Sequence, residues 1–322
     1  MRTLNLSVVV WLFTYVAVAS GDDPEPAKNR LVIRPNPASQ WGGQIQDVEK
    51  VLYSSAEPLW QHFPNRELKP ILVEPKGGPI TLFDRGPAGE YRVRLNTGDR
   101  LWAQHAFQFS HEFCHILCGY RAGPNRNKWF EESMCELASL FALRQMSESW
   151  KTAPPYPNWK DYSGALASYA EDRMKNSKLP PGETLADWYL AHEDQLALDA
   201  VNRDFNLVVA GALLPMFERQ PQRWESIEFL NGTGPIEAQS FVVYLNQWHE
   251  RCPPRLQAGV VEIAQQFEIT IPVESNPVRD QIKARYDQQI EALNAQIQDL
   301  RKKRDSELKE LYERQQKERI GR

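Results

Sequence analysis

The sequence predicts an α+β fold that is mainly helical, with a small N-terminal β-sheet and a C-terminal extended helix. Short aliphatic runs separated by glycine and proline occur between residues 70 and 95, which is typical of strands. From residue 99 onward, apolar residues recur mostly with helical spacing. After Pro277 the chain contains no further proline and no tryptophan, so we expect one long helix there.

Composition bounds the class of protein. The 322 residues are 42% hydrophobic and 25% charged, with a formal net charge of -4. These values exclude a wholly disordered chain, a collagen-like fibre and a polytopic membrane protein. The slightly acidic balance gives no indication of a nucleic-acid partner.

The first 20 residues have the pattern of a secretory signal peptide. An apolar run from Val8 to Ala19 follows Arg2, and it is shorter than the roughly 20 residues of a bilayer span. Small residues at Ala17 and Ala19 suit cleavage. We therefore expect a secreted or periplasmic protein with no integral membrane span after cleavage, the alternative being an uncleaved N-terminal anchor.

The remaining chain divides into three predicted regions. Residues 21–43 are rich in proline and acidic residues and predict an extended leader. Residues 44–275 form one domain that begins with a helix over 44–63. Residues 276–322 form a charged long helix with twelve basic and nine acidic residues.

The tail helix carries a short apolar seam. Spacings of four and three alternate along Tyr286, Ile290, Leu293, Ile297 and Leu300. This is the pattern of a coiled coil for two heptads, fewer than the three or four that a sustained zipper needs. Three interpretations stay open: a homodimeric coiled coil, packing on the body or on a partner, and a solvated helix.

The motif that carries chemistry is His-Glu-x-x-His at residues 111–115. Two histidines four residues apart lie on one face of a helix, so His111 and His115 can bind one Zn²⁺ together. Glu112 projects about 100° away from His111, beside the metal, where it can activate a zinc-bound water. We predict one helix from Leu101 to Cys118, with Asp99 as its N-cap and Gly119 after its end.

A catalytic zinc usually has a third protein ligand and one open position. Downstream, Trp129-Phe130-Glu131-Glu132-Ser133 begins another predicted helix. Here the sequence resembles the gluzincin peptidases, in which a second helix brings a glutamate to the metal. The resemblance covers roughly residues 44–145.

The resemblance implies a zincin-like catalytic domain with His111, His115 and Glu132 as zinc ligands and Glu112 as general base and acid. Glu131 is the alternative third ligand, because it stands where such enzymes often carry asparagine. Glu136, one turn after Glu132, is a candidate hydrogen-bond partner of a ligand histidine.

The four cysteines are Cys114, Cys118, Cys135 and Cys252. In an exported protein they allow three complete disulfide pairings, and four buried thiols are the alternative. Cys114 and Cys118 lie one helical turn apart, where a mutual bridge would be strained. Cys118 is also a candidate extra metal ligand.

Peptide hydrolysis needs a donor for the developing oxyanion besides the metal. The candidates in the second half of the chain are Tyr156, Tyr162, Tyr169, Tyr189, His192, Tyr244 and His249. The sequence does not choose among them. A peptide would bind in extended form along the edge of the strand predicted at 91–95.

The sequence therefore predicts an exported zinc-dependent peptidase acting on peptide or protein substrates. The alternative is a non-catalytic exported binding protein on the same scaffold, with the tail helix as its interaction element. A purely structural zinc site is a third interpretation and would need a fourth ligand such as Cys118.

Overall fold

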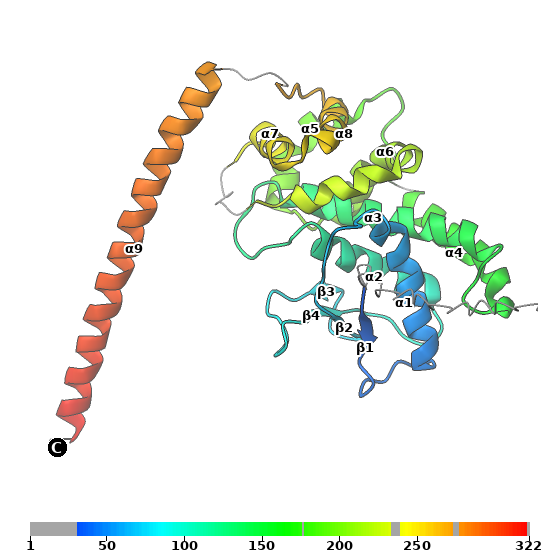
Figure 1. The fold of residues 1–322 in the computed structure, drawn as a ribbon, viewed down its shortest axis with the longest axis horizontal. Coiled ribbons are helices and arrows are strands. Elements are labelled where there is room, and N and C mark those ends of the chain that lie inside the picture. Colours follow the sequence, from blue (N-terminus) through cyan, green and yellow to red (C-terminus); the bar gives the residue numbers. More distant parts are fainter. Residues whose placement is uncertain (1–30, 176, 233–238, 273–276, 321–322) are drawn as a thin grey trace, which may run out of the picture. The chain divides into compact units, whose positions relative to one another are not determined.

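The computed structural model describes residues 31–175, 177–232, 239–272 and 277–320 (Figure 1). The chain forms two compact units, one up to residue 238 and the other from residue 239. The predicted signal peptide, residues 1–20, and the leader up to residue 30 lie outside the described residues. The boundary between the units differs from the predicted boundary at 275/276.

The first unit is mainly helical and contains one small sheet. Its strands are β1 (Ile33–Pro35), β2 (Ile71–Glu74), β3 (Ile80–Thr81) and β4 (Tyr91–Arg94). Its α-helices are α1 (Ile45–Trp60), α2 (Trp102–Leu117), α3 (Lys128–Trp150), α4 (Ser163–Met174), α5 (Leu185–Leu198) and α6 (Arg203–Arg219). Two 3₁₀ helices are η1 (Pro157–Tyr162) and η2 (Pro221–Phe229).

The sheet has the strand order β1-β2-β4-β3. β1, β2 and β4 are parallel, whereas β3 pairs antiparallel with β4 and forms one edge. The expectation that the strand at 91–95 supplies the open edge was therefore wrong, because β4 is paired on both sides. Of the two edge strands, β3 contacts α2 and β1 contacts α1.

Alternation of buried and partly exposed side chains explains the strands. Ile71 and Val73 of β2 are buried on one face, as is Val93 of β4. β1 lies inside the predicted leader at 21–43, because Ile33 can pair with β2 and bury its side chain. The prolines around β1 favoured an extended leader in the sequence, so this strand was not predicted.

Helix α3 is the centre of the first unit. It contacts α1 and α2 on one side and α4 and α6 on the other, and Figure 1 shows it between these layers. Such a helix has no solvated face, and most of its residues are buried. Three glutamates of α3 are therefore buried as well, namely Glu131, Glu132 and Glu136.

Two local expectations need correction. Asp99 does not cap α2: it has a positive φ of 51°, and Leu101 occupies the N-cap position. The prolines between residues 150 and 182 indicate loops in the sequence, but this stretch also contains α4, whose Leu166 and Ala170 are buried. Tertiary packing stabilises α4 despite the many prolines around it.

The second unit contains α7 (Phe241–Arg251), α8 (Pro254–Gln265) and α9 (Pro277–Ile320). α7 packs against α8, and α9 is the long helix expected for the tail. The five side chains of the apolar seam on α9 are exposed in the single chain. None of the helices in the described ranges combines the length and hydrophobicity of a bilayer span.

The packing around α3 generates a stability prediction. Phe141 is buried on α3 and packs on Trp224, with ring centroids 5.4 Å apart. Phe141→Ala should lower the free energy of unfolding by about 3–5 kcal/mol, because it leaves a cavity. Leu198→Ala, at an 88% exposed position, should change it by less than about 0.5 kcal/mol. Urea denaturation measures both, and equal effects would contradict the central place of α3.

Candidate metal centre

The ends of α2 and α3 bring the predicted site residues together. His111 and His115 lie one turn apart on α2, with their rings 5.1 Å between centroids. α2 ends in a Schellman motif: Gly119, with φ of 65°, donates its N–H to Ile116, and Tyr120 donates to the carbonyl of His115. This ending confirms the predicted stop and turns the chain toward α3.

Both histidines turn the same ring atom toward Glu132. The Nε2 atom of His111 lies 3.3 Å from Oε2 of Glu132, and Nε2 of His115 lies 3.5 Å from the same oxygen. Residues that are 17 to 21 positions apart in the sequence thus converge on one point.

These separations fit a metal ion better than two strong hydrogen bonds. Charge-assisted N–H···O bonds are about 2.7–2.9 Å long. Ligand atoms around a tetrahedral ion at about 2.0–2.2 Å are about 3.3–3.6 Å apart by geometry. The two N···O distances fall in the second range, so Oε2 of Glu132 lies at a separation from each Nε2 atom that is typical of two ligands of one ion.

The other ring nitrogens face two further carboxylates. His115 donates from Nδ1 to Oε1 of Glu131 at 2.6 Å, while Nδ1 of His111 is at an ion-pair distance of 3.6 Å from Oε1 of Glu136. Such contacts orient the imidazoles and select the tautomer with Nε2 free for a metal. The structure thus places Glu132, rather than Glu131, opposite both Nε2 atoms, and Glu136 beside His111 as expected.

Asn231 extends this network from the segment after η2. Its amide Nδ2 donates to Oε2 of Glu131 at 2.8 Å and lies 3.7 Å from Sγ of Cys118. Both oxygens of Glu131 therefore accept hydrogen bonds, which fixes the carboxylate against His115. No pattern around Asn231 in the sequence indicated this contact.

Glu112 is held beside the histidines by the edge strand. The hydroxyl of Thr81 lies 2.9 Å from Oε2 of Glu112 and 3.0 Å from its carbonyl oxygen, so its one proton is shared between them. No hydrogen bond or ion pair joins Glu112 to either imidazole in the described part of the chain, and Glu112 lines the same cleft as His111 and His115. Glu112 thus lies beside the atoms that are expected to bind the metal and is not one of these ligands, as the motif predicts.

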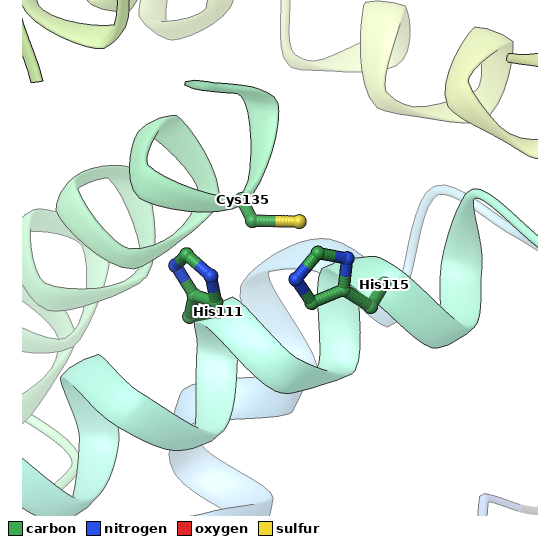
Figure 2. Close-up of side chains that lie close together, drawn as sticks. All are labelled: His111, His115 and Cys135. Carbon is green, nitrogen blue, oxygen red and sulfur yellow. The ribbon is translucent and has the colours of Figure 1, made fainter. Parts of the chain in front are cut away.

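Cys135 is a competing ligand (Figure 2). Its sulfur points toward the two histidine rings, and one ligand atom of each of the three residues lies within 4.8 Å of the others. However, Cys135 is fully buried and does not line the cleft, whereas Glu132 does. We favour Glu132, because its oxygen is close to both Nε2 atoms and reaches solvent.

A second cluster joins His115, Cys118 and Glu131 within the same 4.8 Å limit. The buried groups of α2 and α3 can therefore hold a metal ion in more than one combination. All four cysteines are free thiols in the structure and all are buried.

Charges in the site shift one another strongly. Burial lowers the pKa of His115, but Cys118, Glu131 and Glu132 outweigh burial and raise this pKa well above its usual value. For His111 burial also lowers the pKa, and Glu132 and Glu136 produce a net rise. Burial raises the pKa of Glu132, yet the two histidines lower it well below its usual value. In the metal-free site these shifts favour the protonated form of both histidines and the ionised form of Glu132.

A cleft of about 260 Å³ opens onto these groups. Besides the residues above, its lining includes Ile80, Thr81, Tyr120, Arg121, Lys128, Arg203 and Asn206. The five oxyanion candidates of the first unit do not line it: Tyr156, Tyr162, Tyr169, Tyr189 and His192. Tyr244 and His249 lie on α7 in the second unit.

Tyr120 is the tyrosine that the cleft does contain. Its hydroxyl donates to the carbonyl of Leu82 at 2.5 Å, and its ring lies 6.5 Å from that of His115. One feature of the sequence could have indicated Tyr120: it directly follows Gly119, the glycine at which the helix with both histidines ends.

Comparisons with family models, with curated proteins and with solved structures gave no match.

The two candidate third ligands can be separated. Glu132→Ala should weaken metal binding by at least about 100-fold, because it removes one of the ligand atoms. Cys135→Ala should leave binding within a few-fold of the parent chain. Elemental analysis after dialysis and competition with a chelating dye measure both. The opposite order of effects would assign the ligand role to Cys135.

Metal binding should depend on pH in a defined direction. Metals bind neutral imidazole, whereas the raised pKa values of His111 and His115 keep these rings protonated in the metal-free chain. Affinity should therefore increase as the pH rises from 6 to 8, with about one proton or more released per ion at pH 7. Calorimetry in two buffers of different ionisation enthalpy counts these protons.

The same shifts set the stability of the metal-free chain. A raised pKa in the folded state stabilises it fully below the unfolded value of 6.5, and this contribution is lost as the pH rises through the raised pKa.

The metal-binding prediction has one contradicting outcome. A metal affinity that does not change with pH, together with no proton release on binding, would contradict the protonated pair of histidines.

Proposed function

We propose that this chain is an exported zinc-dependent peptidase that hydrolyses peptide bonds. One observation carries the proposal. Oε2 of Glu132 faces Nε2 of both His111 and His115, while Glu112 lies beside them with its own support from Thr81. A divalent ion would satisfy all three facing atoms at once.

Zinc is the ion that this donor set favours. Two imidazole nitrogens and one carboxylate oxygen are typical of catalytic zinc, which keeps a fourth position open. The three residues line a cleft, so solvent can reach that position. When bound, zinc supplies Lewis acidity, which polarises a carbonyl and acidifies water.

Glu112 is the proposed general base and acid. Thr81 holds one of its oxygens, Oε2, and the residue, which is 3% exposed, lines the cleft. It can take a proton from the attacking water and pass it to the leaving amine. A group fixed in this way needs little reorganisation during the reaction.

The edge strand β3 offers the substrate a place to pair. Leu82 donates its N–H to Arg92, and Gly78 donates to Leu95, so alternate residues of this segment face β4. In an antiparallel pair the intervening residue turns its backbone groups the other way. The N–H and C=O of Thr81 therefore point away from β4, and an extended peptide can add there as a further strand.

The rest of the proposal follows the sequence. The order of α1, the small sheet, α2 and α3 suits a zincin-like catalytic domain of the gluzincin kind. Export depends on the signal pattern at residues 1–20. The tail helix α9, with its exposed apolar seam, is the proposed contact for a second copy or another partner.

The test separates chemistry from metal binding. Glu112→Gln keeps the size of the side chain and removes the basic oxygen, so we expect peptide cleavage to fall by at least about 10²-fold. Zinc content should stay at that of the parent chain. Glu148→Gln, on the exposed end of α3, serves as the control and should change neither.

Cleavage of a peptide library, with and without chelator, is the measurement. Cleavage by Glu112→Gln at the parent rate would refute the role of this residue. A parent chain that binds zinc and cleaves nothing would favour the non-catalytic binding protein instead.

A further inference from the structure

The cleft contains three basic side chains that the proposed chemistry does not use. They are Arg121, Lys128 and Arg203, and they share its lining with four glutamates. Arg121 donates to the carbonyl of Gly232, so its charge is partly engaged. Lys128 and Arg203 differ from it in having weak or no polar contacts among the described residues.

Arg203 is the first residue of α6. It is exposed at the cleft, and no hydrogen bond or ion pair joins it to another described residue. Its side chain lines the same cleft as Glu136 and the two histidines. A cation in the first turn of a helix opposes the helix dipole, so local stability does not explain an arginine at this position.

Lys128 is the first residue of α3 and lies one turn before Glu132. Its Nζ is 3.9 Å from Oε1 of Glu132, while Oε2 of that carboxylate faces the histidines. An ion on Oε2 would withdraw charge from the same carboxylate. Lys128 would then lack a full counter-ion at the edge of the metal centre.

Formal charges along the cleft make the same point. With a divalent ion bound and both histidines neutral, the four carboxylates, the three basic groups and the ion give a net charge of +1. Every carboxylate already has a partner: Glu112 has Thr81, Glu131 has Asn231, and Glu132 and Glu136 face the histidines. The surplus is therefore positive and lies on groups at the mouth.

We propose that Arg203 and Lys128 bind a carboxylate of the peptide substrate, so the cleft selects peptides with a negative charge near the scissile bond. This inference rests on the proposed function. The carboxylate can come from a free C-terminus, as in a carboxypeptidase substrate, or from an aspartate or glutamate side chain. Arginine and lysine both pair well with carboxylates, arginine by two parallel N–H···O bonds.

Binding and cleavage are measured on the full chain with matched peptides. The first pair has one sequence with a free C-terminal acid or a C-terminal amide. The second pair is amidated and carries aspartate or asparagine beside the central bond. Affinities are measured by calorimetry with Glu112→Gln, with and without Zn²⁺, so that the peptides stay intact. Cleavage rates are measured with the parent chain.

We expect the charged member of at least one pair to bind about tenfold more tightly, as a charge-assisted contact provides. Arg203→Gln and Lys128→Gln should each reduce this preference to about threefold or less, with zinc content unchanged. Arg219→Gln at the other end of α6 and Lys151→Gln at the other end of α3 are the matched controls and should preserve it.

Equal binding of charged and neutral peptides would overturn the inference, as would a preference that survives in both variants. The latter would assign the carboxylate to the metal alone. A preference that disappears in the variants, in a parent chain that cleaves no peptide, would support the carboxylate site and refute the peptidase.

Discussion

The contact on which the site depends is the one between two imidazoles of α2 and three carboxylates of α3. His111 and His115 meet Glu131, Glu132 and Glu136 inside the interface of the two helices. Ionised groups are expensive to bury unless each has an opposite charge or a hydrogen-bond partner. Each imidazole faces one carboxylate with Nδ1, and both imidazoles face Glu132 with Nε2. This division separates the groups that orient the histidines from those that can hold an ion.

The antiparallel course of α2 and α3 produces this pairing. His111 faces Glu132 and Glu136, whereas His115, one turn later on α2, faces Glu131 and Glu132. The residue numbers of the contacting glutamates on α3 therefore decrease as the residue numbers of the histidines on α2 increase. Glu131 and Glu132 are neighbours in sequence and differ by about 100° around the helix, so one points to Nδ1 and the other to Nε2 of His115. The turn of about 100° between successive residues of α3 thus directs these two adjacent glutamates to different ring nitrogens of His115.

Residues in these two helices were predictable, because their chemistry is encoded in local spacing. The interval between His111 and His115, the glutamate between them and the spacing from Glu132 to Glu136 each place side chains on one helical face. The resemblance favoured Glu132 and left Glu131 as the alternative, since the choice depends on how α3 is rotated against α2. The structure makes that rotation visible.

Contacts between distant segments were not predictable in the same way. Thr81 reaches Glu112 because β3 is the edge strand, and Asn231 reaches Glu131 from a loop about 100 residues later. Neither residue has a neighbour pattern that indicates its partner. The same is true of β1, whose pairing with β2 needs a crossover through α1. Sequence periodicity describes one element at a time, so pairing between elements has to come from the fold.

The burial of α3 also explains why its charged residues are informative. A helix covered on both sides by other helices normally carries apolar residues all round. Glu148, near the exposed end of α3, can be satisfied by water and by Lys151. Glu131 and Glu136 have no such access, and burial raises the pKa of each. The two histidines face these carboxylates and offset the cost of burying them. The same reasoning places Cys135 among the packing residues, because a neutral thiol needs no counter-charge when it is buried.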